Sequence, residues 1–150
     1  FRSFSNTKNP KVLSLTRQNL KYLDYDIDYS DFLNGGFVIS KGKDLTIFAS
    51  GSEVNLALEI KEILKEFSVQ VVSVPILNKL TPEISKSLNN NKLIFTIELG
   101  KAEGWSDYIG DITESFSVQT FGKSAPEKDL AEFFKLNAES IGKKIRNYLS

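Results

Sequence analysis

Three short apolar segments, separated by stretches with helical character, constrain the fold of this chain more than any other feature. They are Leu45–Ala49 (LTIFA), Val69–Val74 (VQVVSV) and Leu93–Ile97 (LIFTI). Their length and their β-branched, apolar content are typical of buried strands. Strands that alternate with helices predict an α/β fold, in which helices cover both faces of the sheet. We therefore expect a three-layer sandwich with a mostly parallel (mixed) sheet of about five strands.

The segments between these strands carry helix signals. After Ser50–Glu53, apolar residues at helical spacing continue to about Glu66. Thr81 and Pro82 predict the start of a shorter helix, because threonine is a good N-cap and proline suits the first helical position. Asn89–Asn91 end that helix. Two further helices are expected over about 126–134 and 138–149.

The N-terminal part of the chain has a different character. Residues 11–16 predict a strand, and residues 20–34, rich in Tyr and Asp, show no clear period and predict a connecting segment. Gly35-Gly36 closes this segment and marks a candidate domain boundary. Short strands are expected at Gly36–Ser40 and Ser117–Phe121.

Charge and hydropathy exclude several classes of partner. The chain has 150 residues, and its 19 Lys and Arg balance its 19 Asp and Glu. A neutral chain has no electrostatic footprint for nucleic acid or an anionic membrane, so we expect neither as a partner. Its apolar runs are only a few residues long, and no signal peptide is visible at its start.

Missing residue types narrow the chemistry further. The chain has no Cys, no His and no Met. A Ser–His–Asp triad and a Cys–His pair are therefore excluded within it, and a zinc site is disfavoured. The first residue is Phe1 rather than Met, from which we expect a piece of a longer protein.

Two strand-to-helix turns are candidate binding sites. Ser50–Glu53 could hold a phosphate on the N–H groups of a helix start, but it matches neither phosphate-binding glycine motif. We favour a tight turn in which Ser52 caps the helix and Glu53 interacts with its dipole. The Phe121–Pro126 turn also favours a structural role, with Ser124 as a cap and Glu127 in the first turn, although Lys123 is free to touch an anion or a partner.

Glu98, Trp105 and Arg17 are the remaining candidates, each with two interpretations. Glu98 ends a strand, where a carboxylate is either catalytic or an edge residue bonded to neighbouring N–H groups. Trp105 lies in a loop-like stretch, residues 101–110, and is either a packing anchor or an interface hot spot beside Tyr108. Arg17 follows the strand over 11–16 and is either a surface residue or an anion ligand.

These segments together resemble the C-terminal end of transketolase, a thiamine-diphosphate enzyme of the pentose phosphate pathway. The pieces that carry the resemblance run in order along the chain: Leu15-Thr16-Arg17-Gln18-Asn19-Leu20, Gly35-Gly36-Phe37-Val38, Ala49-Ser50-Gly51-Ser52-Glu53-Val54, Val71-Val72-Ser73-Val74-Pro75, Glu98 with Trp105–Gly110, and Phe121-Gly122-Lys123-Ser124-Ala125-Pro126. They are similar to the family's L-S-R-Q-N-L, G-G-Y-V, A-T-G-S-E-V, V-V-S-M-P and F-G-x-S-A-P. Thr16 and Val74 depart from the family's Ser and Met, and the segment at 79–81 lacks its aromatic–acid pair.

The resemblance implies a division of the chain and a role for one residue. Residues 1–20 would be the tail of the pyrimidine-binding domain, 21–34 a linker, and 35–150 the C-terminal domain. Arg17 would bind the phosphate of the sugar substrate, since the arginine of this motif does so in the family. No catalytic, cofactor-binding or metal-binding residue of the family maps onto this chain.

The resemblance also implies the properties of the parent protein. That protein would transfer a two-carbon ketol unit between a ketose phosphate and an aldose phosphate, as a cytoplasmic homodimer with thiamine diphosphate and a divalent metal (Mg or Ca). This piece alone would bind no cofactor and be inactive, and would supply structure, dimer contacts and one phosphate ligand. Two alternatives stay open: the C-terminal domain of a sister enzyme, such as deoxyxylulose-phosphate synthase or a 2-oxoacid dehydrogenase β part, or a stand-alone module that binds phosphate or a nucleotide at Ser50–Glu53.

Overall fold

The structure of the chain is a computed structural model. It describes residues 10, 16, 19–23, 25, 30, 32, 35–77, 82–88 and 91–150. The strand predicted over 11–16 lies outside the described residues apart from Thr16, and so does the predicted cap Thr81.

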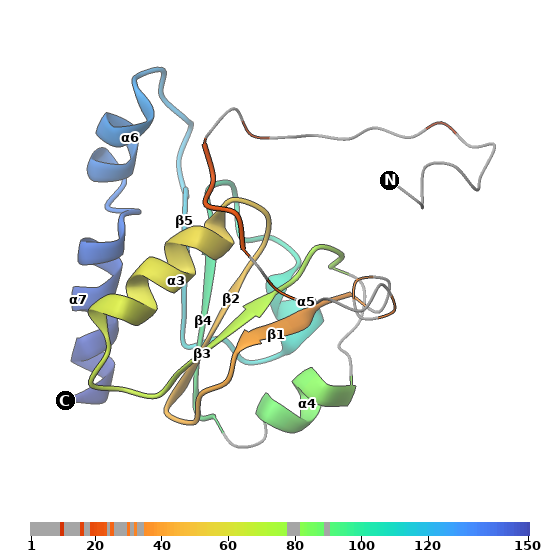
Figure 1. The fold of residues 1–150 in the computed structure, drawn as a ribbon. Coiled ribbons are helices and arrows are strands. Elements are labelled where there is room, and N and C mark those ends of the chain that lie inside the picture. The colour runs from red at the N-terminus through yellow and green to blue at the C-terminus, as the bar shows by residue number, and fades with distance from the viewer. Residues whose placement is uncertain are drawn as a thin grey trace.

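A mixed sheet forms the centre of the molecule (Figure 1). Its strands are β1 (Phe37–Ser40), β2 (Leu45–Ala49), β3 (Val69–Ser73), β4 (Leu93–Glu98) and β5 (Glu114–Ser117). Their order across the sheet is β1-β3-β2-β4-β5, and every neighbouring pair is parallel except β1 with β3. The predicted mostly parallel, mixed sheet is confirmed.

Helices cover both faces of this sheet, which confirms the predicted three layers. One face carries α3 (Glu53–Ile63) and α7 (Ala138–Leu149), and the other carries α4 (Pro82–Leu88) and α5 (Trp105–Ile109). A further helix, α6 (Glu127–Phe133), lies beyond the carboxyl ends of the strands (Figure 1). The loops at the carboxyl edge of the sheet therefore lie beside α6.

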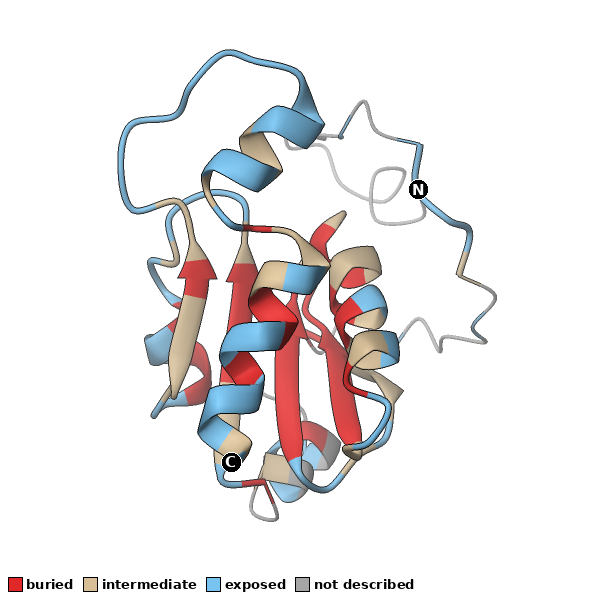
Figure 2. Ribbon diagram, turned by 90° about the vertical axis from the view of Figure 1, so that its left-hand side faces the viewer, coloured by how far each residue is buried: buried red, intermediate tan, exposed pale blue. Residues whose placement is uncertain are grey.

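Strand β2 is buried on both faces, and its side chains alternate between the two halves of the core. Ile47 packs with α3 and α7 residues, whereas Phe48 packs with Val72 and Trp105. A strand with helices on both sides has no polar face, which is why LTIFA lacks a regular alternation of apolar and charged residues. The central strands are the most buried part of the molecule (Figure 2).

A small polar cluster interrupts the apolar core. The Thr46 hydroxyl oxygen accepts hydrogen bonds from the side-chain amides of Gln70 (3.1 Å) and Asn91 (2.6 Å). All three residues are buried, and the pairing satisfies groups that would otherwise be costly to remove from water. The cluster joins β2, β3 and the segment that enters β4.

The prediction for β5 is wrong in position. We expected a strand over 117–121, and the strand runs over Glu114–Ser117. Phe116 is the aromatic residue in the core, with its ring 5.9 Å from that of Phe95, whereas Phe121 is 98% exposed. Both aromatics lie in stretches of similar composition, so the sequence could not indicate which of them pairs with β4.

Helix ends differ from the predictions by a few residues. Helix α3 ends at Ile63 rather than near Glu66, and α6 is one residue shorter at each end than predicted. Helix α7 has the predicted bounds, and the side chain of Asn137 caps it by accepting a hydrogen bond from the N–H of Ser140 (2.8 Å).

We predict that Gly36→Ala destabilises the domain. A Cβ at this position would lie 2.7 Å from the carbonyl oxygen of Ser73 and 3.3 Å from Cδ1 of Ile84. Crowding a packed core in this way costs about 1–3 kcal/mol in the free energy of unfolding, measured by urea titration. Gly122→Ala is the matched control, since a Cβ there meets nothing within 4 Å; equal losses from both variants would contradict the crowding argument.

Candidate functional site

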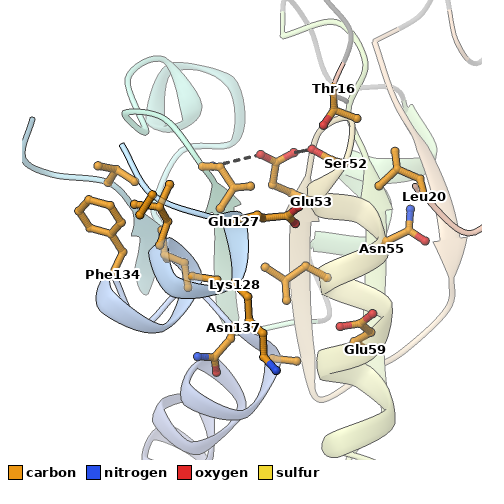
Figure 3. A pocket seen from close by; sticks show the side chains of 18 of the residues that line it. Thr16, Leu20, Ser52, Glu53, Asn55, Glu59, Glu127, Lys128, Phe134 and Asn137 are labelled. Carbon is orange, nitrogen blue, oxygen red and sulfur yellow. Dashed lines mark hydrogen bonds between the residues drawn. The ribbon is translucent and has the colours of Figure 1, made fainter. Parts of the chain in front are cut away.

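The carboxyl ends of β2, β4 and β5 border a cleft of about 1160 Å³ (Figure 3). Its walls come from the first half of α3, from α6 and the loop before it, and from Thr16 and residues 19–21 of the N-terminal segment. Sites in parallel sheets tend to lie at this edge, because the loops that leave neighbouring strands converge there. The predicted site residues Ser52, Glu53 and Lys123 all line this cleft.

Glu53 ties together the loops that follow β2 and β4. Its Oε1 accepts a hydrogen bond from the backbone N–H of Leu99 (3.2 Å), and its Oε2 accepts one from the Ser52 hydroxyl (2.9 Å) (Figure 3). The residue is buried, and it lies in the first turn of α3, where the helix dipole favours a negative charge. The anion at the start of this helix is therefore the chain's own carboxylate.

This arrangement corrects one prediction about Ser50–Glu53. The segment is a tight turn, as expected, with Gly51 at a φ of +56°. Ser52 does not cap α3, because its own backbone is helical and its hydroxyl donates to Glu53 instead of accepting from a helix N–H. The N–H groups of residues 53, 54 and 55, at the start of the helix, donate to the backbone carbonyl oxygens of residues 50, 51 and 52, so the geometry disfavours a phosphate site here.

Glu98 lies at the end of β4, close enough to Glu53 for the two charges to interact. Burial raises the pKa of the Glu98 carboxyl above its ordinary value of 4.5, and the Glu53 carboxylate raises it further. Hydrogen bonds with the Trp105 side chain and the Gly100 backbone oppose this rise. Of the two interpretations of Glu98, the edge carboxylate held by neighbouring donors describes its contacts.

Trp105 and Tyr108 are core residues, which corrects the interface interpretation. They lie in helix α5 rather than in a loop, and they are 1% and 8% exposed. The Trp105 ring packs between those of Phe48 and Tyr108, with centroids 6.4 Å from each. Burial also raises the pKa of Tyr108 above its ordinary value. Neither side chain is available as an anchor for a second subunit.

The turn before α6 does not carry the predicted cap. The N-cap position belongs to Pro126, and no side chain caps the helix, so Ser124 is not a cap. Glu127 lies in the first turn as expected. Lys123 is exposed, and its Nζ lies 4.0 Å from the centroid of the Phe133 ring.

Arg17, the predicted substrate ligand, lies outside the described residues. Its described neighbours Thr16 and Asn19 are exposed and line the cleft. The phosphate role of Arg17 is therefore still a prediction.

The part of the chain that the structure describes contains neither a candidate metal cluster nor a helix that could span a membrane. No group of three or more His, Cys, Asp or Glu residues there could hold a metal ion. None of the helices formed by those residues is long and apolar enough to cross a membrane.

Comparison with known proteins defines the class of this domain. A family model described as "Transketolase-like TK C-terminal domain" matches residues 35–137. The chain belongs to this family. The match begins at Gly35, two residues before β1.

Curated relatives extend the similarity over nearly the whole chain. The transketolase of Bacillus subtilis is 31% identical over 93% of this chain, and that of Streptococcus pyogenes is 33% identical over 96%. The aligned regions are only 23% and 22% of those two proteins. The chain therefore spans less than a quarter of the length of the relatives it matches.

A solved structure gives the same result for the fold. The transketolase of Pichia stipitis, crystallised as a mutant in complex with fructose-6-phosphate, is 26% identical and superposes with a TM-score of 0.72 over 87% of this chain and 20% of that protein. Other structures of this enzyme were obtained with xylulose-5-phosphate and sedoheptulose-7-phosphate.

The contact between Glu53 and Leu99 is the feature of the site that the sequence analysis missed. The signal was present, because both residues follow strands that were predicted to be parallel, and parallel neighbours deliver their loops to one edge. What the sequence could not show is that β2 and β4 are neighbours, since β3 lies between them along the chain but on the far side of β2 in the sheet.

We predict that Glu53 contributes to stability through its hydrogen bonds. Glu53→Ala leaves the Leu99 N–H without this acceptor, at a cost of about 1–3 kcal/mol in unfolding free energy, while Glu53→Gln keeps an acceptor oxygen and costs less. Glu59→Ala, at an exposed position of the same helix, is the control. The unfolding free energy is measured by urea titration. If Glu53→Ala lowers it no more than the control does, the hydrogen bond from Leu99 to Glu53 does not contribute to stability.

Glu98 makes stability depend on pH in a defined direction. Its pKa is higher in the folded chain than the ordinary 4.5, so the folded state holds this proton more tightly. The resulting stabilisation is present below pH 4.5 and is lost as pH rises through the folded-state pKa. We expect Glu98→Gln to remove this component from a profile of unfolding free energy against pH; an unchanged profile would show that Glu98 is not its source.

Proposed function

We propose that this chain is the C-terminal domain of a transketolase, which transfers a two-carbon ketol unit between sugar phosphates. The observation that carries the proposal is the family match over residues 35–137, together with transketolases as relatives over more than nine-tenths of the chain. Similar structures hold fructose-6-phosphate, xylulose-5-phosphate or sedoheptulose-7-phosphate, which supports sugar phosphates as substrates of the parent protein.

In this proposal the chemistry belongs to the upstream domains of the parent. The chain has no His and no Cys, and Glu53 and Glu98 make contacts within the domain. We place thiamine diphosphate and its divalent metal (Mg or Ca) upstream, in a cytoplasmic homodimer. This piece alone would then bind no cofactor.

The proposed division of the chain assigns residues 1–20 to the pyrimidine-binding domain and residues 21–34 to a linker. The start of the family match at residue 35 supports a boundary there. Arg17 then belongs to the preceding domain, and its guanidinium would bind the substrate phosphate, since its fork of donors suits phosphate oxygens.

Neither alternative gains support from the comparisons. The family description and the curated relatives reported above name transketolase and not a sister enzyme. A stand-alone phosphate or nucleotide module at Ser50–Glu53 is disfavoured because the first N–H groups of α3 already donate to carbonyl oxygens of the turn.

Arg17→Ala in the full-length protein tests the proposed substrate contact. Loss of a charge-assisted hydrogen bond of about 1.5–3 kcal/mol lowers kcat/KM by roughly 10- to 150-fold for fructose-6-phosphate but not for fructose. Arg17→Lys keeps the charge without the fork, so we expect an intermediate loss. Lys21→Ala, an exposed cation of the same segment, is the control. Equal losses with both sugars would assign Arg17 a structural role.

A further inference from the structure

The loop that joins β4 to α5, residues 99–104, is largely uncovered. Its residues are exposed except for Ala102, and Leu99, which is 40% exposed, lines the cleft. Its backbone is tied to other elements at the Leu99 N–H and at the Gly100 carbonyl oxygen, which accepts a hydrogen bond from the Val118 N–H (3.0 Å). A segment with few buried contacts opens at a low cost in free energy, so each of these bonds matters for its position.

Two carboxyl groups act on this loop from opposite sides of the sheet. Glu53, at the start of α3, accepts the hydrogen bond from the Leu99 N–H at 3.2 Å (Figure 3). Ile97 packs in the half of the core that α3 covers, and side chains alternate along a strand, so Glu98 faces the other half. There it forms a hydrogen bond with the side chain of Trp105. Glu98 and Leu99 are consecutive residues, so a displacement of one moves the other.

The charge that acts on Glu98 is that of Glu53. The two groups are close enough for the Glu53 carboxylate to disfavour ionisation of Glu98. Lys101 and Glu103 of the loop form an ion pair with each other at 3.3 Å, and both are exposed. The remaining titratable side chains of the described elements around the loop are Asp107 and Tyr108 on α5, and Lys123 and Glu127 at the turn before α6.

The protonation state of Glu98 changes the balance of these contacts. When Glu98 is ionised, repulsion from Glu53 and attraction to the donors of Trp105 and Gly100 both displace it away from Glu53. That displacement strains the adjacent bond between the Leu99 N–H and Glu53. When Glu98 is neutral, the repulsion is absent and the bond is kept. The raised pKa of Glu98 has the matching sign, because the closed loop holds this proton more tightly.

We propose that Glu98 is a pH-sensitive switch for the wall of the cleft. With its carboxyl neutral, the loop 99–104 is closed and Leu99 stays bonded to Glu53. With the carboxyl ionised, that bond weakens and Leu99 withdraws from the cleft. The closed loop is therefore favoured at low pH, and it opens as pH rises through the titration of Glu98. The switch involves only residues of this domain, so it does not depend on the activity proposed for the parent protein.

Amide hydrogen exchange of the full-length protein, followed by mass spectrometry from about pH 4 to about pH 8, tests this proposal. Wild type is compared with Glu98→Gln, whose side chain is neutral at every pH. The comparison is made at equal pH, because the chemical rate of exchange itself depends on pH. The peptide that contains Leu99 and Gly100 reports opening of the loop, and a peptide from β2 reports unfolding of the whole domain.

We expect the loop peptide to exchange alike in the two proteins at the acidic end of the range. At the alkaline end it exchanges roughly 2- to 10-fold faster in wild type, the range for coupling between neighbouring groups. This change exceeds that of the β2 peptide. A difference between the two proteins that does not vary with pH overturns the proposal. So does an equal change in both peptides, because it would show unfolding of the domain instead of a local opening.

Two further variants separate the switch from a general effect of charge. Glu103→Gln removes an exposed carboxylate from the same loop, and we expect it to behave as wild type does. Glu53→Gln removes the repelling charge, so Glu98→Gln changes the exchange of the loop peptide less in that background than in wild type. An effect of Glu98→Gln that is equally large without the Glu53 carboxylate would reject the switch.

Discussion

Burial of β2 on both faces is the constraint on which the rest of the structure depends. A strand in this position needs a parallel neighbour on each side and a helix layer above and below it. β3 and β4 are those neighbours, and α3, which follows β2 directly, packs back over the sheet. The same geometry brings the start of α3 next to the end of β4, where Glu53 meets the Leu99 N–H.

That contact gives the carboxyl edge of the sheet an unusual use. In open α/β sheets this edge commonly receives a ligand, but here two carboxylates of the domain itself, Glu53 and Glu98, occupy the ends of β2 and β4. Both carboxylates therefore serve contacts within the domain at the edge that borders the cleft. The uncovered apolar area lies further out, on α6 and the loop before it.

The elements that the sequence predicted well are the apolar central strands and a helix with a strong apolar period. LTIFA, VQVVS and LIFTIE form strands because their apolar content has no other stable position, and α7 has the predicted bounds. The predictions failed where the sequence allowed two outcomes. Phe116 rather than Phe121 enters the core, and the Ser52 hydroxyl donates to a carboxylate instead of capping the helix. Trp105 is a further case, because a tryptophan suits an interface as well as a core, and here it lies in the core.

The hydrogen bonds of Thr46 to Gln70 and Asn91 have a consequence for strand alignment. β2 and β3 are buried on both faces, so they lack the alternation of buried and exposed residues that sets the alignment of half-buried strands. A shift of one residue would turn the Gln70 amide toward the opposite layer, and a shift of two would place it against an apolar side chain without an acceptor. The hydrogen bond to the Thr46 hydroxyl thus favours one alignment of β2 and β3 over others in which the apolar residues are buried to a similar extent.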